Sequence, residues 1–220
     1  QDVSSRFRDL LTPGIRMAIV IAVGLAVLQH LSGGAALTMY APIIYQKAGY
    51  PSPKEAIGMA VLLNACHLAC VVIAIIFVER WGRKPLLITG LGIKAAGHLV
   101  LAVFFEQGII GLPFIVVYFI TTCISNISIA PIAWLVMAEI FPNNIRAKGM
   151  TVTTFVLFGA SYCNLHLFPI VSEYFEKLRG SPSGVFILFG ILCMAGIVFV
   201  WRIVPETKGK SLEEGPAYFF

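Results

Sequence analysis

The chain has 220 residues, of which 58% are hydrophobic and only 12% are charged, and its net charge is +5. Because so few polar side chains cannot cover a water-exposed surface, this composition excludes an ordinary soluble domain and predicts that lipid covers much of the chain. The basic residues lie between apolar runs and near the termini instead of forming one patch, so nucleic acid is not an expected partner.

Six long apolar segments follow one another along the chain. Five contain no Asp, Glu, Lys or Arg, and each is longer than the roughly 20 residues that a helix needs to cross the hydrocarbon layer. They are residues 17–46, 56–78, 107–138, 149–172 and 180–201, and the sixth, residues 85–105, is interrupted by Lys94 alone. Because these runs are continuous and do not alternate as barrel strands do, they predict an all-α membrane protein with six transmembrane helices.

The apolar segments divide the chain into three parts. Residues 1–13 carry Phe7, Leu10 and Leu11 at helical spacing among charges, which predicts an amphipathic segment lying in the membrane interface. The six-helix bundle is expected over residues 14–204, and residues 205–220 are expected to form a polar tail. The chain begins at Gln1 and not at Met, which leaves open that a segment precedes it.

Lysine and arginine are unevenly divided between the two ends of this bundle. If successive loops alternate between the two faces, eleven of these residues fall on the face that carries both termini, and four fall on the other. Cytoplasmic loops carry the excess of basic residues, so both termini and the tail are expected in the cytoplasm. The four on the opposite face are Lys47, Lys54, Lys177 and Arg179.

Two of the predicted spans contain residues that weaken a helix. Gly33 and Gly34, followed by Pro42, interrupt the first span, and interrupted helices line binding cavities in transporters. Paired glycines also permit close helix packing, and the sequence leaves both interpretations open. In the fourth span, Pro131 removes a backbone hydrogen bond and predicts a kink beside Trp134.

The sequence predicts no metal, no cofactor and no enzyme. Cys66 and Cys70 flank His67, but a helix points the imidazole away from the two thiols, and no further ligand motif is evident. All five cysteines lie inside predicted spans, where a free thiol acts as a small apolar side chain. No nucleophile, base and orienting group occur together in a recognisable motif.

Three of the spans end at the predicted cytoplasmic face with a carboxylate that a cation follows. A carboxylate at a helix C-terminus opposes the helix dipole and therefore needs a nearby cation. We predict one network that ties these helix ends together and breaks when they separate, the alternative being ordinary interface anchors. Its members are Glu79, Arg80, Arg83, Glu139, Arg146, Glu206 and Lys208.

The sequence motifs that carry these charges resemble motifs of the sugar-porter branch of the major facilitator superfamily. They are ERWGRK at residues 79–84, EIFPNNIR at 139–146 and PETKGKSLEE at 205–214, the last being highly specific. The resemblance covers residues 16–214, but each string belongs to the second half of the family's twelve-helix body. It therefore implies half of a major facilitator fold, with its 3+3 helix repeat.

The resemblance also implies a cavity for a small polar solute. Substrate-binding roles would fall to Gln29, His30, Asn64 and Trp134. Cavity or gate roles would fall to Gly33, Tyr40, Pro131, Phe158 and Ser161. The first span departs from the family's pattern, since His30, Ala35 and Met39 replace Gln, Asn and Tyr. Because a sugar site is harmed severely when it loses a donor or acceptor, these replacements argue against unchanged glucose-like binding.

Lys94 and His98 lie four residues apart in the third span and hence on one helix face. A lysine within a membrane is by default either functional or paired, and the spans offer no named acidic partner for it. The sequence leaves open a contact with a partner subunit or a side chain that extends towards the membrane surface.

Two functions are compatible with these observations. The first is membrane transport of a sugar or related small polar solute by alternating access, as one half of a carrier that a complementary six-helix chain or a second copy completes. The second is a degenerate transporter half that serves as a non-transporting subunit of a larger membrane assembly. The intact charge strings favour the first, which is our hypothesis, whereas the altered first span and Lys94 favour the second.

Overall fold

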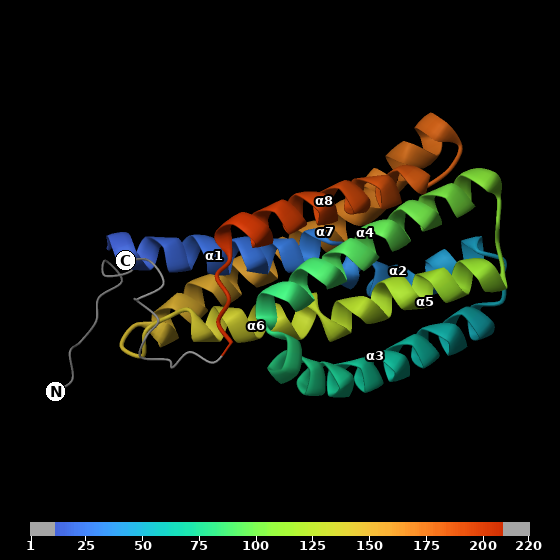
Figure 1. Ribbon diagram of the computed structural model, residues 1–220. Helices are drawn as coiled ribbons and strands as arrows, with labels where there is room; N and C mark the ends of the chain where they lie inside the picture. Colours follow the sequence, from blue (N-terminus) through green and yellow to red (C-terminus); the bar gives the residue numbers. More distant parts are fainter. Residues whose placement is uncertain (1–11, 209–220) are drawn as a thin grey trace.

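The computed structural model describes residues 12–208, which form an elongated bundle of eight helices (Figure 1). The helices are α1 (Pro13–Leu31), α2 (Gly34–Lys47), α3 (Pro53–Trp81), α4 (Arg83–Gln107), α5 (Leu112–Ile127), α6 (Ile129–Glu139), α7 (Arg146–Arg179) and α8 (Ser183–Ile203). Together they make six segments long and apolar enough to cross a membrane, because α1 with α2 and α5 with α6 each form one span. The predicted six-span fold is confirmed. The expected interfacial segment lies almost wholly outside the described residues, as does most of the tail.

The first span is interrupted between α1 and α2. Gly33 has a φ of +85°, a left-handed conformation that glycine adopts without steric cost, and its N–H donates to the carbonyl of His30 at 3.0 Å. The helix therefore ends at Leu31 and begins again at Gly34. Pro42 lies inside α2 and does not end it. The break thus comes from the glycine and not from the proline.

The fourth span is interrupted at Ser128, between α5 and α6. Pro131 has no N–H, so it cannot bond to the carbonyl four residues earlier, which is that of Ile127, the last residue of α5. Ser128 turns its hydroxyl back to the carbonyl of Ile124 at 2.9 Å. The kink predicted from Pro131 is therefore present as a complete break one turn before the proline.

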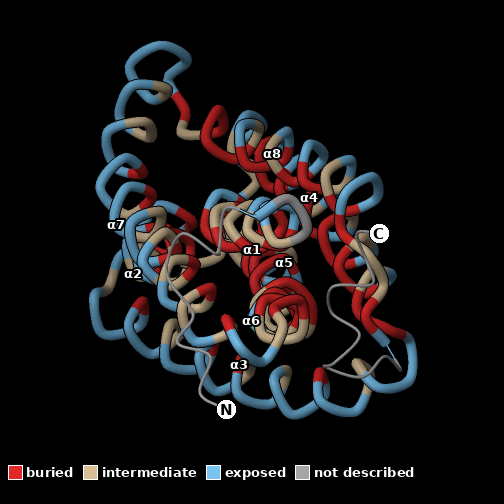
Figure 2. The backbone as a smooth tube through the Cα atoms, turned by 90° about the vertical axis from the view of Figure 1, so that its left-hand side faces the viewer, coloured by how far each residue is buried: buried red, intermediate tan, exposed pale blue. Residues whose placement is uncertain are grey.

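The spans differ in how far the rest of the chain covers them. In their most apolar stretches, half of the residues of α4 and of α8 are buried, against 17% in α3 and 11% in α7. Figure 2 shows α3 and α7 at the periphery with long exposed runs, whereas α1, α5 and α6 lie near the centre. The apolar faces of α3 and α7 are thus left for lipid or for another helical body to cover.

We expect the conformation of Gly33 to be a measurable source of stability. In a Gly33→Ala variant, the left-handed conformation would cost roughly 1–2 kcal/mol, and the new Cβ would lie 2.8 Å from the Phe189 ring. The free energy of unfolding in detergent should fall by about 2 kcal/mol. Gly92→Ala in α4 is the control, because its Cβ would meet only Ile197, at 4.0 Å. Equal losses in both variants would contradict the role given to the left-handed turn.

Candidate functional site

A cavity of about 420 Å³ lies between the two helix breaks, with α3 and α7 on its flanks. Its lining is polar but carries no Asp, Glu, Lys or Arg side chain. The lining residues with polar side chains are Gln29, His30, Thr38, Asn64, His67, Ser125, Asn126 and Ser161. Such a set suits a polar solute, because hydroxyl, amide and imidazole groups both donate and accept hydrogen bonds.

The break in the first span brings backbone carbonyls to this depth of the bundle, and side chains from other helices bond to them. The carbonyl of His30 accepts a hydrogen bond from Asn164 Nδ2 of α7 at 2.9 Å. The carbonyl of Ser32 lies 3.1 Å from His98 Nε2 of α4, which must donate because a carbonyl only accepts. The carbonyl of His30 also accepts the Gly33 N–H, so the two side chains add bonds from α4 and α7 to the backbone at the break.

Several side chains around the cavity have polar atoms that no group of the described chain satisfies. They are Gln29 Oε1, both ring nitrogens of His30, His67 Nε2 and Ser125 Oγ. A buried polar atom without a partner costs about 1–3 kcal/mol, so such atoms are uncommon unless they have a use. Their gathering at one cavity indicates a site that offers hydrogen bonds to a solute.

The structure brings four of the predicted site residues to this cavity. Gln29, His30, Asn64 and Ser161 line it together. Asn64 Nδ2 bonds to the carbonyl of Ala60 in its own helix at 2.8 Å, which leaves its amide oxygen to the cavity. Ala35 and Met39, two of the three replaced positions, also line it. The cavity therefore carries apolar groups where the family pattern has polar ones.

The other predicted residues lie elsewhere. Trp134 and Phe158 are outside the lining of the cavity and are 37% and 65% exposed. Pro131 lines a separate pocket of about 280 Å³ together with Glu79. Gly33 forms the break itself, and Tyr40 lies further along α2.

Four residues with polar side chains in the cavity lining were not predicted from the sequence as solute contacts: Thr38, His67, Ser125 and Asn126. Ser125 and Asn126 lie just before the break that Pro131 causes, so a polar pair five and six residues ahead of an intramembrane proline was the available signal. The sequence around His67 suggests only a metal ligand, because Cys66 and Cys70 flank it. In the structure it lies one turn from Asn64 on the same face of α3.

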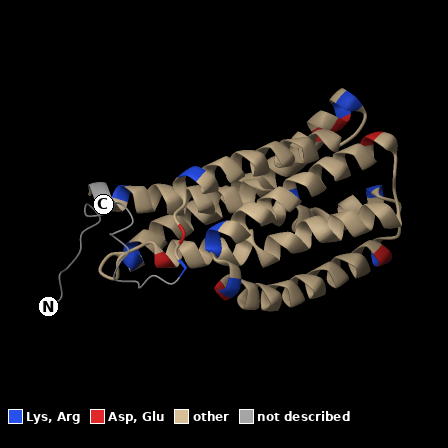
Figure 3. Ribbon diagram, viewed as in Figure 1, with Lys and Arg blue, Asp and Glu red and all other residues tan. Residues whose placement is uncertain are grey.

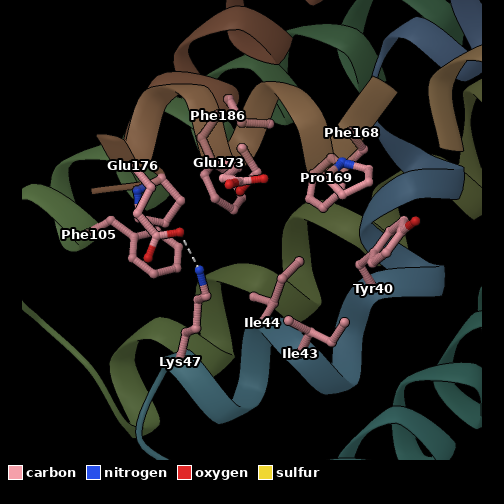
Figure 4. A pocket seen from close by; sticks show the side chains of 13 residues that line it. Tyr40, Ile43, Ile44, Lys47, Phe105, Phe168, Pro169, Glu173, Glu176 and Phe186 are labelled. Carbon is pink, nitrogen blue, oxygen red and sulfur yellow. Dashed lines mark hydrogen bonds and ion pairs between the residues drawn. The ribbon is translucent and has the colours of Figure 1, made fainter. Parts of the chain in front are cut away.

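A second pocket, of about 260 Å³, lies between α2 and α7 near the end of the bundle where α2 ends (Figure 4). Tyr40 donates its hydroxyl to the carbonyl of Leu165 at 3.1 Å and stacks on Phe168. Lys47 and Glu176 point towards one another across the pocket, with Nζ 2.6 Å from Oε2. These contacts hold α2 against α7.

Most of the charged residues gather towards the ends of the helices, as Figure 3 shows. At the end formed by the C-termini of α3, α6 and α8, here called the network end, Arg83 is buried with 7% of its side chain exposed. Its Nη2 lies 2.9 Å from Glu139 Oε1 of α6 and 3.2 Å from Glu79 Oε1 of α3. One guanidinium therefore links α3, α4 and α6.

Glu206 joins the segment after α8 to the same cluster. Its carboxylate accepts hydrogen bonds from the backbone N–H groups of Arg83 and Lys84 at 3.0 Å each, and so caps the N-terminus of α4. Burial by itself would raise the pKa of Glu206, but these bonds, a third from the Lys208 N–H and the charge of Arg83 outweigh it and lower the pKa. Thr207 donates to Glu139 Oε2 at 2.5 Å.

Of the remaining predicted members of the network, Lys208 and Arg146 donate to backbone carbonyls, and Arg80 contributes its own backbone carbonyl. Lys208 Nζ donates to the carbonyl of Arg80 at 2.7 Å. Arg146 donates through Nε and Nη2 to the carbonyl of Phe141, within its own loop. Arg146 thus stabilises the turn between α6 and α7, and none of the ion pairs between described residues includes it.

Comparison with known proteins gives a consistent result. The family model described as "Sugar (and other) transporter" matches residues 3–219. "Sugar transporter ERD6-like 18" of Arabidopsis thaliana is 33% identical over 220 residues, covering 97% of this chain and 44% of the relative. "D-xylose-proton symporter-like 2" of the same plant is 32% identical over 219 residues, covering 97% of this chain and 42% of the relative.

A solved structure of the proton:xylose symporter XylE, bound to 6-bromo-6-deoxy-D-glucose, superposes with a TM-score of 0.84 at 28% identity. That match covers 97% of this chain and 46% of XylE. The chain therefore spans less than half the length of the relatives that it matches.

Removing the carboxylate of Glu139 should destabilise the network end. Glu139→Gln removes the less exposed of the two carboxylates that pair with the buried guanidinium of Arg83, and losing one partner of a buried pair costs about 3 kcal/mol. Unfolding in detergent, followed by circular dichroism, would measure the loss. Glu173→Gln is the matched control, because its pair with Lys177 is exposed and should contribute little. Similar losses in both variants would contradict this account.

The lowered pKa of Glu206 predicts how its contribution depends on pH. A carboxyl whose pKa is lower in the folded state stabilises the fold above its ordinary pKa of 4.5 and loses that effect as pH falls through the lowered value. The stability difference between the wild type and Glu206→Gln should thus be constant at neutral pH and shrink in acid below pH 4.5. Thermal unfolding of both proteins across this pH range would measure it. A difference that grows in acid would contradict the assignment.

Proposed function

Because the chain belongs to the sugar (and other) transporter family, in the sugar-porter branch of the major facilitator superfamily, we propose that it moves a sugar or a related small polar solute across a membrane by alternating access. It is an integral membrane protein with six spans. The observation that carries the proposal is the polar cavity between the two helix breaks, with its unsatisfied side-chain atoms. Its relatives are named as sugar transporters and symporters, not as enzymes.

The proposed carrier has a second wall that this chain does not form. The cavity is flanked by α3 and α7, whose apolar stretches are the least covered of the six spans. A complementary six-helix body against these two helices would close the cavity and cover their faces. That body is a further part of the same polypeptide, a separate chain or a second copy.

Within this cavity, Gln29, His30 and Asn64 are the proposed hydrogen-bonding residues. Trp134 and Phe158 are largely turned away from it, so their proposed roles depend on the second wall. The contacts of α2 with α7 support a gate function for Tyr40. A short helix that follows a break can rotate when the contacts of Tyr40 and Lys47 with α7 are broken.

The network end is the proposed cytoplasmic end, from its excess of lysine and arginine. The bonds of Arg83, Glu139 and Glu206 join helices of this half alone. We therefore assign the network the task of keeping this half rigid while it rocks against the other.

A second candidate function rests on the cavity lining. Ala35 and Met39 replace polar groups of the family pattern and line the cavity. A half that has lost solute contacts suits the alternative of a non-transporting subunit in a larger assembly. The unsatisfied polar atoms of Gln29, His30 and Ser125 favour transport. Burying them without hydrogen-bond partners destabilises the fold, and a subunit that binds no solute gains nothing in return.

Transport by the natural assembly that contains this chain is the test. After purification with all co-purifying chains and reconstitution into vesicles, we expect uptake of labelled D-xylose or D-glucose. Gln29→Leu removes a cavity acceptor and should lower kcat/KM roughly tenfold. Gln46→Leu is the control, because Gln46 is exposed near the end of α2. Absence of uptake of any sugar or polyol, together with stable recovery among unrelated subunits, would favour the alternative.

A further inference from the structure

Lys94 lies in the middle of α4 and is 1% exposed. The other charged residues of the described chain lie towards the ends of the helices, so this ammonium is the one charge inside a span among residues 12–208. It donates to Ser32 Oγ at 2.9 Å. None of the ion pairs in this part of the chain includes it. A cation desolvated in this way lacks a balancing negative charge within the described protein.

The ammonium lies directly behind the wall of the cavity. A side chain at Gly34 would begin 3.3 Å from Lys94 Nζ and 3.4 Å from Ser125 Oγ, so both polar atoms face the space that this glycine leaves. Gly34 and Ser125 both line the cavity. The charge therefore lies close to two residues of the cavity lining.

The helix break brings the N-terminus of α2 to the same place, next to the C-terminus of α1. The helix α2 begins at Gly34, and its N-cap Gly33 offers no side-chain acceptor to the first N–H groups. Those N–H groups carry the positive end of the helix dipole. Half-helix N-termini at a break are the groups that meet anionic parts of a substrate in membrane carriers.

No Asp or Glu side chain is among the lining residues, so the negative potential there comes only from the C-terminal ends of α1 and α5 and not from a carboxylate. Three side chains of the lining are more than nine-tenths buried and have unpartnered polar atoms: His30 and His67, each 8% exposed, and Ser125, 5% exposed. A hydroxyl and a protonated ring nitrogen both donate to oxygen anions. The site thus has donors and a net positive charge but lacks an anion.

We propose that the solute is a sugar-like molecule that carries a carboxylate, a sugar acid, with Lys94 as the charge that balances it. His30 and Ser125 bond the carboxylate, and Gln29 and Asn64 bond the neutral hydroxyls. This inference rests on the proposed function and specifies the substrate class of the same cavity. One lysine matches one carboxylate, whereas a phosphate ester carries about 1.5 to 2 negative charges at neutral pH and would remain uncompensated.

The test is competition for transport in vesicles that hold the carrier with whatever body completes it. Uptake of labelled D-xylose is measured against unlabelled D-glucuronate, D-glucose and D-glucose 6-phosphate, and uptake of labelled D-glucuronate is measured directly. We expect D-glucuronate to compete at concentrations about tenfold lower than D-glucose, from the attraction of one charge at a few ångströms in a protein interior.

Lys94→Met keeps the length and apolar stem of the side chain but removes the charge, so it should abolish the preference for D-glucuronate over D-glucose, measured as the ratio of their competing concentrations on the same vesicles. Lys177→Met is the matched control, because it removes an exposed lysine near the end of α7. It should leave the preference intact.

The outcomes separate the two proposals. Uptake of D-xylose without a preference for D-glucuronate, or a preference that survives Lys94→Met, overturns the sugar-acid inference and leaves transport standing. Stronger competition by D-glucose 6-phosphate than by D-glucuronate overturns the choice of a carboxylate. Uptake of neither D-xylose nor D-glucuronate overturns the transport function and the inference together. Uptake of D-glucuronate alone supports both.

Discussion

The organisation of this chain depends on one constraint: inside a lipid layer, every backbone polar group must find its partner within the protein. Unbroken helices meet this condition, and a break meets it only where other side chains reach the freed groups. Both breaks obey this rule. The carbonyls beside Gly33 are bonded by Asn164 and His98, and Ser128 turns its hydroxyl to the carbonyl of Ile124. The breaks thus draw polar side chains to the middle of an apolar bundle, and the cavity lies between them.

The same constraint explains where the charges lie. The carboxylates of the described chain gather towards helix ends, where orphan N–H groups and cations satisfy them. Glu206 shows this most clearly, because the start of α4 and the following lysine supply it with backbone donors. Since Arg83 contacts Glu79 and Glu139 from that same helix start, one residue stabilises three helix ends at once. Such a network favours motion of these helices as one unit, which the proposed alternating access requires.

The sequence predicted the spans because charge-free runs of sufficient length are decided by transfer from water to lipid, a local property of each segment. It pointed to both interruptions for a related reason, since a glycine and a missing proline N–H act on their own helix, although for the first span it left close helix packing open as the alternative. Contacts between helices were harder to predict from the sequence. Whether Trp134 or Ser125 faces the cavity depends on how α5 and α6 are rotated, and the run of apolar residues hides that rotation. Arg146 bonds to a carbonyl of its own loop, because the turn after Phe141 brings that oxygen within reach.

The break between α1 and α2 also couples Lys94 to the cavity. The ammonium donates to Ser32 Oγ, and that hydroxyl donates to the carbonyl of Gln29 at 3.0 Å, so a continuous chain of bonds leads from the buried charge to a residue of the lining. Such chains polarise one another in surroundings of low dielectric. A solute at Gln29 and the charge at Lys94 therefore act on the same short segment, the hinge from which α2 begins. A negatively charged solute bound at this point would balance the charge of Lys94 beside the hinge. The charge of the solute would then affect the stability of the break.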